Sequence, residues 1–360
     1  MQAVKQMLVV VMIATFAVVG ISSTAMAVKT IKLHHLNKDD PFDNPTGAMA
    51  TVFKSLVEAG TNGSVMVQTF PSGQLGKDKD VVQQVKAGVI QSGIHSVGGF
   101  ASAYPLIGVL DVPFAFPNIS KTYEVFDGPF GKQLAADIDK KTGMHTLGFG
   151  DSGGFFHLTN SKRPIHSPAD MEGVKIRTMG LDTHKAIITA MGGQPAAISW
   201  SEVYTALQTG VADGQMNPIP IIAFAKFQEV QKYLTLSGHI FAPYVWVMNE
   251  DFWNSLSDSE KSVVEYAAKS AIVAGRGMGR VIEASDRGLK ELSKNLEVNT
   301  LTAAEKEEFR KVAVPAVKKL IVEKFGADGE ELLNAFLAAV QIRFRTAPRH
   351  SPASPGSAFA

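Results

Sequence analysis

The chain of 360 residues contains no cysteine. Without thiols it can form no disulfide, no thiolate metal site and no cysteine nucleophile, and it has no N-terminal cysteine that could carry a lipid. Its 9 histidines are scattered, and none forms the spaced pair that is typical of metal ligands on a helix. The sequence therefore predicts neither a metal nor another cofactor.

An excess of charge of one sign is also missing. Lys and Arg number 35 against 34 Asp and Glu, which gives a net charge of +1, and the charged residues are spread along the chain. A nucleic-acid-binding surface needs a concentrated patch of positive charge. We therefore expect no nucleic-acid partner.

Long apolar runs are absent after the N-terminus. The run over residues 7–21 is shorter than the about 20 residues that a membrane-spanning helix needs. Lys5 precedes this run, and Ala25-Met26-Ala27 follows it with the small-x-small pattern of a cleavage site. We predict a signal peptide over residues 1–27, cleaved after Ala27, and a periplasmic mature protein. A retained membrane anchor is the alternative.

Strands and helices alternate from Val28 onward. The opening reads as a βαβαβ unit, and a second unit begins near residue 155. Because parallel strands need crossover connections, this order predicts mostly parallel sheets flanked by helices. The pattern predicts one helix over Ile119–Lys141 and one over Ser257–Asn295, the latter about 55 Å long if continuous. Helices are also expected over Ala303–Gln341, broken at Gly326.

These elements predict an α/β protein of two domains, with the long helix crossing both. We place the first domain at residues 28–152 with 239–282, and the second at 153–238 with 283–341. Residues 342–360 are rich in Pro, Ser, Ala and Arg without periodicity, so we expect a disordered tail.

Two glycine-rich strings resemble catalytic or cofactor motifs. Gly150-Asp151-Ser152-Gly153-Gly154 matches the string around the serine of trypsin-like proteases, but the matching histidine segment and an all-β pattern are missing. We interpret it as a crossover between the domains. Residues 275–279 lack the spacing of a dinucleotide-binding loop and lie inside the long predicted helix. Close packing or a bend is expected there.

Three runs in the middle of the chain carry a family resemblance. They are residues 160–165 (NSKRPI), 168–178 (PADMEGVKIRT) and 201–218 (SEVYTALQTGVADGQMNP). In this order and spacing they closely resemble the DctP family, the solute-binding proteins of tripartite ATP-independent periplasmic (TRAP) transporters, over about residues 30–341. The resemblance implies a two-domain periplasmic binding protein fold without enzymatic activity. Such a protein captures an organic acid in the cleft between its domains and delivers it to a two-part membrane permease.

Arg177 is the predicted anchor for the ligand. It ends a short apolar strand, and its planar guanidinium can bind a carboxylate through two parallel hydrogen bonds. The resemblance implies that Arg177 forms the salt bridge with the ligand carboxylate. It also implies that Asn217 binds the ligand or holds the arginine, and that Trp200 lines the cleft.

The chain departs from the family pattern at Phe156. Many members carry a second arginine near this position, whereas this chain has Phe156 followed by His157, which could donate a hydrogen bond instead. One cation fewer disfavours a dicarboxylate and favours a monocarboxylate with an apolar, aromatic or sugar-like body. Four further residues lie where family members contact ligand from the first domain, although each is as typical of a helix cap or turn: Asp39, Asp78, Ser96 and Tyr244.

Two other functions fit parts of the sequence. A secreted α/β enzyme could act on an organic acid through Asp78 and His95. A sensory protein could present the same ligand to a membrane receptor instead of a permease.

The signal peptide can be tested directly. When the full chain is expressed with an export-competent bacterial host, the periplasmic fraction should contain a protein that begins at Val28. N-terminal sequencing and the intact mass measure this. A membrane-bound protein that retains Met1 would instead establish the anchor.

Overall fold

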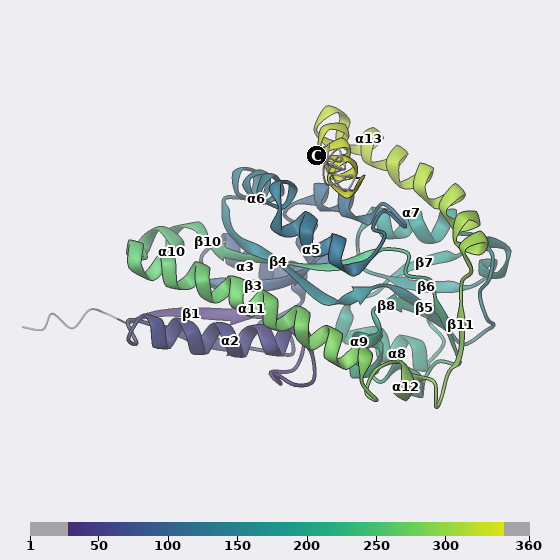
Figure 1. The fold of residues 1–360 in the computed structure, drawn as a ribbon, viewed down its shortest axis with the longest axis horizontal. Helices are drawn as coiled ribbons and strands as arrows, with labels where there is room; N and C mark the ends of the chain where they lie inside the picture. Colours follow the sequence, from purple (N-terminus) through teal and green to yellow (C-terminus); the bar gives the residue numbers. More distant parts are fainter. Residues whose placement is uncertain (1–27, 342–360) are drawn as a thin grey trace, which may run out of the picture.

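The computed structural model describes residues 28–341, which form two β-sheets side by side with helices packed around them (Figure 1). The predicted signal peptide and the predicted tail over residues 342–360 lie outside the described residues. No helix between residues 28 and 341 combines the length and the apolar character that crossing a bilayer requires.

The first sheet has five strands in the order β2-β1-β3-β10-β4. β1 pairs in parallel with β2 and β3, whereas β10 runs antiparallel to both β3 and β4. The bounds are Lys29–His34 for β1, Val65–Phe70 for β2, Ser92–Ser96 for β3, Met144–Phe155 for β4 and Phe241–Asn249 for β10.

The second sheet has six strands in the order β11-β9-β5-β8-β6-β7. β5 is antiparallel to β8 and β9, and the other pairs are parallel. The bounds are His157–Asn160 for β5, Lys175–Thr178 for β6, Gln194–Ala197 for β7, Gly214–Asn217 for β8, Tyr233–Leu236 for β9 and Glu297–Thr300 for β11.

The two reversed strands are those that follow a crossing between the sheets. β5 comes directly after β4 of the first sheet, and β10 comes after β9 of the second. The parallel strands β1, β3, β6 and β8 end at the side where the sheets face each other, so a strand entering from that side must run the opposite way. The glycine-rich string at residues 150–154 lies in the second half of β4, on the path of this crossing.

Helices cover both sheets (Figure 1). Those beside the first sheet are α2 (Pro45–Gly60), α3 (Asp78–Lys86), α4 (Val97–Phe100), α5 (Ile119–Asp127), α6 (Pro129–Thr142) and α10 (Glu250–Ser255). Those beside the second are α7 (Asp182–Ala190), α8 (Val203–Gln208), α9 (Ile219–Phe224) and α12 (Leu289–Leu292). Short 3-10 turns are η1 (Pro105–Asp111), η2 (Pro168–Met171), η3 (Trp200–Glu202) and η4 (Phe227–Glu229). We call the first sheet with its helices the first lobe, and the second sheet with its helices the second lobe.

The longest unbroken helix is shorter than predicted. α11 begins with the expected capping box of Ser257 and Glu260 but ends at Ala284, so it runs for about 40 Å rather than 55 Å. The chain turns at Ser285, and a side chain at Gly288 would meet the carbonyl oxygen of Ile282 at 2.5 Å. Figure 1 shows α11 running from α10 to α9, and it therefore crosses both lobes.

The prediction of a single helix over 119–141 is wrong as well. Gly128 and Pro129 divide this segment into α5 and α6, with Pro129 at the start of the second helix. A proline fits the first turn of a helix, where its missing N–H has no partner to lose, but not a helix interior.

The last helix, α13 (Ala303–Gln341), bends at Gly326 as predicted, with φ 57° and ψ −138° at this glycine. Beyond the bend, the ring of Phe336 packs edge-on against that of Phe116, with 5.4 Å between the ring centroids, and its centroid lies 5.5 Å from that of Phe130. α13 thus contacts α7 of the second lobe as well as α5 and α6 of the first. The predicted domain limits stay a prediction.

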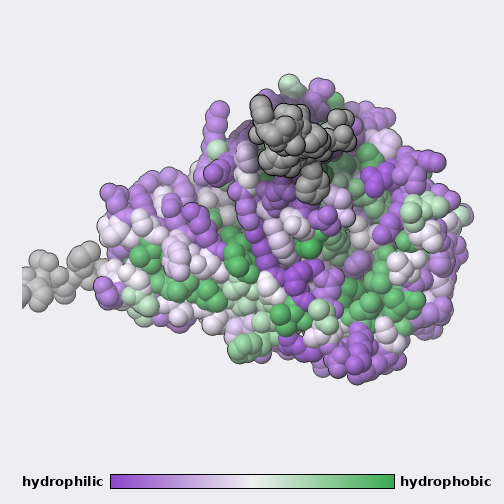
Figure 2. Space-filling model, viewed as in Figure 1, coloured by the Kyte–Doolittle hydropathy of each residue, from purple (hydrophilic) through white to green (hydrophobic). Residues whose placement is uncertain are grey.

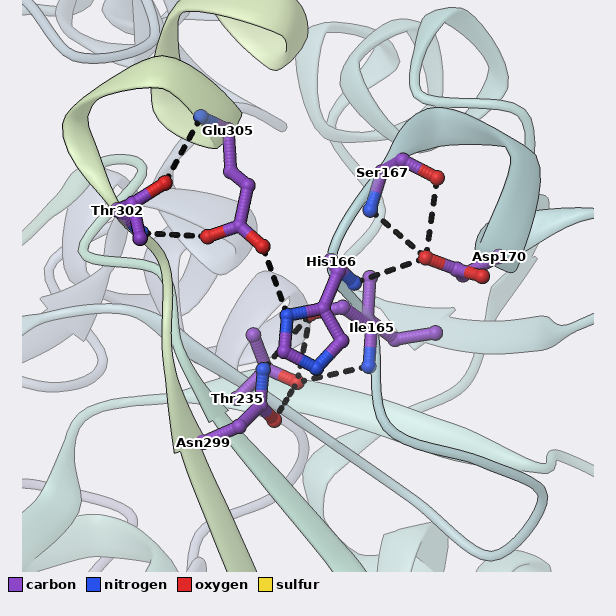
Figure 3. A network of polar contacts seen from close by, with 8 residues as sticks. All are labelled: Ile165, His166, Ser167, Asp170, Thr235, Asn299, Thr302 and Glu305. Carbon is purple, nitrogen blue, oxygen red and sulfur yellow. Dashed lines mark hydrogen bonds and ion pairs between the residues drawn. The ribbon is translucent and has the colours of Figure 1, made fainter.

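The start of α13 is fixed by a polar network (Figure 3). Thr302 and Glu305 exchange hydrogen bonds between side chain and backbone, and the carboxylate of Glu305 also lies 2.8 Å from the Nδ1 atom of His166. Asn299 of β11 receives a hydrogen bond from Thr235 at 2.8 Å and donates one to the carbonyl of Ile165 at 2.9 Å. These contacts hold the edge of the second sheet to the first turn of the helix.

On the face shown in Figure 2, polar residues predominate and groups of apolar residues lie between them. Exposed valines on α11 include Val273 and Val281, which are 65% and 55% exposed. On the opposite side of the same helix, glycines allow a close approach to α2. A Cβ atom on Gly275 would lie 2.5 Å from Cγ of Met49 and 3.0 Å from the carbonyl oxygen of Pro45. The expected close packing in residues 275–279 is confirmed.

Two glycines of this helix provide a matched test. Gly277 faces open space, so Gly277→Ala should raise the free energy of unfolding by up to about 1 kcal/mol through helix propensity. Gly275→Ala gains the same propensity but overpacks the contact with α2, at a cost of about 1–3 kcal/mol, and should be the less stable variant. Urea unfolding of both variants measures the difference. Equal stability would mean that α2 and α11 are not in close contact.

Candidate ligand-binding site

A cavity of about 500 Å³ lies between the lobes, where the parallel strands of both sheets end. Seven of the nine predicted ligand-binding residues line it: Phe156, Arg177, Trp200 and Asn217 from the second lobe, and Asp78, Ser96 and Tyr244 from the first. Ligands of α/β proteins commonly bind outside the carboxyl ends of parallel strands. The cavity occupies that position in both sheets at once.

Arg177 lies in β6 and is only 4% exposed. Its backbone is held between β7 and β8, and its Nε atom donates a hydrogen bond to the carbonyl of Ile198 at 2.9 Å. Within residues 28–341 no carboxylate forms an ion pair with it. Burial lowers the pKa of Arg177 to about 10, so the guanidinium remains charged at neutral pH. A buried cation without a counter-ion is strongly disfavoured, and an anion in the cavity would supply that counter-ion.

Asn217 ends β8, next to the strand of Arg177. Its Nδ2 atom donates to the side-chain oxygen of Gln215 at 2.5 Å, and Gln215 donates in turn to the hydroxyl of Thr159 at 2.9 Å. Thr159 donates to Gln231 at 2.9 Å. This buried chain of hydrogen bonds fixes the orientation of the Asn217 amide beside the cavity.

Asp78 is the acidic group of the first lobe. It begins α3, and it accepts hydrogen bonds from Nδ1 of His95 at 2.6 Å, the backbone N–H of Ser96 at 2.9 Å and the Ser96 hydroxyl at 2.7 Å. Burial opposes ionisation, but the electrostatic interaction with His95 and the hydrogen bonds from His95 and Ser96 hold the pKa of Asp78 below its usual value. The carboxylate is therefore ionised, although it is 8% exposed.

Tyr244 and Asn37 form a second polar pair in the first lobe. The Nδ2 atom of Asn37 donates to the hydroxyl of Tyr244 at 3.2 Å and to that of Thr46 at 2.9 Å. Burial raises the pKa of Tyr244 to about 12, so its hydroxyl keeps its proton. Asn37 lines the cavity but was not predicted. Asn37 follows β1, just as Asn217 ends β8. This shared position at the end of a strand was the signal in the sequence that could have indicated Asn37.

Aromatic residues form part of the cavity wall. Phe156 is 2% exposed and meets the ring of His184 edge-on at 5.9 Å. Trp200 opens η3 and meets Phe227 edge-on at 5.9 Å. With Met179, Ile198 and Ile221 they give the second lobe an apolar surface around Arg177.

Two predicted residues lie outside the cavity lining. Asp39 is 36% exposed, accepts a hydrogen bond from Thr69 at 2.7 Å and lies 3.7 Å from Nε2 of His35. His157 accepts the backbone N–H of Gly238 on its Nδ1 atom at 3.1 Å, and burial lowers its pKa to about 4. His95 also stays outside the lining, with its Nε2 atom buried and unpartnered among the described residues. The pair of Asp78 and His95 thus exists, but its imidazole does not reach the cavity.

An ion pair that the sequence did not indicate spans the cavity mouth. Nζ of Lys77, just before α3 in the first lobe, lies 2.7 Å from the carboxylate of Glu202 in η3 of the second. The two side chains are 50% and 54% exposed. No local pattern links residues so far apart in the sequence, because the contact depends on how the lobes meet.

Comparison with known proteins agrees with this architecture. The family model of bacterial extracellular solute-binding proteins, family 7 (DctP), matches residues 37–324. The chain belongs to this family. These proteins are the periplasmic ligand-binding components of TRAP transporters, and both the predicted family and the predicted two-domain α/β fold are confirmed.

Several relatives have named ligands. The C4-dicarboxylate-binding periplasmic protein DctP of Rhodobacter capsulatus is 32% identical over 292 residues, or 79% of this chain and 85% of that protein. A TRAP solute-binding protein of Polaromonas sp. JS666 bound to D-erythronate is 33% identical, with a TM-score of 0.78 over 86% of this chain and 98% of that one. A homologue from Sulfurospirillum deleyianum with bound succinate is 34% identical, with a TM-score of 0.77 over 87% of this chain and 100% of that one.

Buried histidines make the stability of the protein sensitive to acid. Burial, with a further contribution from neighbouring histidines, lowers the pKa of His34 and of His239 from 6.5 to about 3. Both are neutral in the folded protein above that value, whereas the unfolded chain takes up protons below about pH 6.5. Their contribution to stability is therefore complete above pH 6.5 and is lost as the pH falls toward 3.

His34 is the better test because neither ring nitrogen has a hydrogen-bond partner among the described residues. Between pH 6.5 and 4, a histidine of this kind contributes a slope of about 1.4 kcal/mol per pH unit to the free energy of unfolding. His34→Leu should reduce the slope by about that amount and leave it unchanged above pH 7. Urea unfolding at intervals from pH 4.5 to 8 measures it. An unaltered slope would show that His34 titrates normally in the folded protein.

Proposed function

We propose that the protein captures an organic acid in the cavity between its lobes, with the ligand carboxylate bound to Arg177, and delivers it to a two-part TRAP permease. The observation that carries this proposal is the buried guanidinium, which pairs with no carboxylate among residues 28–341. A charge-assisted, two-fold hydrogen bond to a carboxylate compensates such a cation more strongly than a neutral acceptor does.

The named relatives support the ligand class. Their ligands are C4-dicarboxylates, D-erythronate and succinate, all of which are organic acids. We infer the same class for this chain, with Asn217 beside the carboxylate and Trp200 and Phe156 against the carbon skeleton.

Ligand binding would favour closure of the lobes. Arg177 belongs to the second lobe and Asp78 to the first, so one ligand can contact both only when they are close. A ligand shifts such an equilibrium by its difference in affinity for the two forms. The exposed ion pair of Lys77 and Glu202 also joins the lobes, but exposed pairs contribute about 0–1 kcal/mol. This ion pair therefore adds little to the preference for the closed form.

We further propose that the protein acts after export, free in the periplasm, and releases its ligand unchanged. The imidazole of His95 lies outside the cavity lining, so it is not placed to exchange a proton directly with a bound acid. Recovery of intact ligand from the purified complex would support this, whereas steady turnover would establish an enzyme.

Replacement of the anchor tests the ligand site. Arg177→Ala should weaken binding by about 2–5 kcal/mol, as removal of one partner of a buried charge pair does, or roughly 30-fold to several thousand-fold in dissociation constant. The measurement is calorimetric titration with the acid that gives the largest thermal shift among dicarboxylates, sugar acids, 2-oxo acids and aromatic acids.

Arg163→Ala is the matched control. Arg163 belongs to the same lobe but lies outside the cavity, where its guanidinium donates to the carbonyl of Glu172. Binding should be unchanged in this variant. Micromolar binding retained in Arg177→Ala would show that the anchor lies elsewhere.

A further inference from the structure

We propose that the ligand is a monocarboxylate whose body carries hydrogen-bond donors, hydroxyl groups above all, and that the cavity selects against dicarboxylates and plain alkyl acids. This inference rests on the proposed function, because it takes Arg177 as the carboxylate anchor. It depends on the distribution of charge, donors and acceptors around the rest of the cavity.

In the part of the chain that the structure describes, the cavity lining offers a second carboxylate no further buried cation. Besides Arg177, the cationic side chains of the lining are Lys77 and Lys79. Lys77 is already paired with Glu202 at 2.7 Å, and Lys79 is exposed at the border with a neighbouring cavity. Water screens an exposed charge. The position of Phe156, next to the start of β5, offers an aromatic ring instead of a charge.

The first lobe contributes a buried acidic group to the same cavity. Asp78 lines the cavity as a buried carboxylate, and a like charge beside it would be repelled. A carboxylate has about four acceptor positions, and three hydrogen bonds from His95 and Ser96 reach this one. One position is left for a donor from the ligand.

Asn37 also favours a ligand with a hydrogen-bond donor. Its Nδ2 atom donates to both Thr46 and Tyr244, which uses the two hydrogens of the amide. The group that remains for a ligand is its carbonyl oxygen, which accepts only. The first lobe thus presents acceptors from Asp78 and Asn37 beside the hydroxyl of Tyr244, whereas the second presents the donor Arg177. A molecule that fits both has one carboxylate and, at the other end, donors.

The apolar residues of the cavity lining indicate the size and kind of carbon skeleton that the ligand has. Trp200, Phe156 and Met179 can pack against a carbon skeleton, and about 500 Å³ accommodates a chain or ring of six carbons with its substituents. A plain alkyl acid would satisfy these contacts but would leave the remaining acceptor position of Asp78 and the carbonyl oxygen of Asn37 desolvated without a donor, which is costly.

Four acids with the same six-carbon chain separate these possibilities in calorimetric titrations of the mature wild-type protein: gluconate, adipate, hexanoate and 6-aminohexanoate. Gluconate should bind at least about tenfold more tightly than adipate or hexanoate, since a site built for a hydroxyl rejects the analogue that lacks it. 6-Aminohexanoate carries an ammonium donor instead, and tighter binding of this acid than of gluconate would identify an amino acid as the donor-bearing ligand. The inference would be overturned if adipate or hexanoate bound as tightly as whichever of gluconate and 6-aminohexanoate binds more tightly.

A charge-neutral variant tests the role of Asp78. Asp78→Asn should weaken the binding of gluconate at least about tenfold, while the binding of adipate should be unchanged or tighter. Asp80→Asn, on the exposed side of the same helix, should change neither. If the Asp78 variant does not fold, the wild-type series still decides. If the wild type prefers adipate and Arg177→Ala abolishes binding, the proposed function is retained and this inference is rejected. If binding does not depend on Arg177, both are rejected.

Discussion

The buried guanidinium of Arg177 is the constraint on which the ligand site depends. A charge that is 4% exposed, with no carboxylate paired to it in residues 28–341, is unfavourable by itself. β7 and β8 on either side of β6 and the hydrogen bond to Ile198 keep its side chain from turning away to water. The cost of holding this cation in place is what makes a carboxylate an effective ligand.

The position of the cavity follows from how the chain passes between the sheets. Each crossing delivers a reversed strand, β5 into the second sheet and β10 into the first, and both start at the face where the parallel strands end. Phe156 and Tyr244 therefore lie near the starts of these strands, opposite Asn217 and Ser96 at the ends of their neighbours. One arrangement of strands brings residues from distant parts of the sequence around one cavity.

The two walls of the cavity differ in chemistry because their polar groups are already engaged in different ways. Gln215 holds the amide of Asn217, while His95 and Ser96 hold Asp78. Fixed in this way, the second lobe presents a positive charge and apolar rings, and the first presents the acceptors of Asp78 and Asn37 beside the hydroxyl of Tyr244. Preorganised polar groups select a ligand in two ways. They favour a ligand that makes contacts with them, and they disfavour a ligand that leaves them without a hydrogen-bond partner.

Local patterns in the sequence were sufficient for the alternation of strands and helices, the capping box of α11, the bend at Gly326 and the close packing at Gly275, since each of these depends on neighbouring residues. They were not sufficient for the ends of the helices. Gly128-Pro129 and the turn at Ser285 divide segments whose apolar periodicity continues through them.

The family resemblance in residues 160–218 predicted Arg177, Trp200 and Asn217 as ligand-binding residues, and all three line the cavity. The partners of Asp78, the role of Asn37, the exclusion of Asp39 and His157 from the lining, and the ion pair of Lys77 with Glu202 were decided by the tertiary structure alone. Each of these depends on the distance between side chains that strand order and lobe contact bring together, and sequence separation carries no information about that distance.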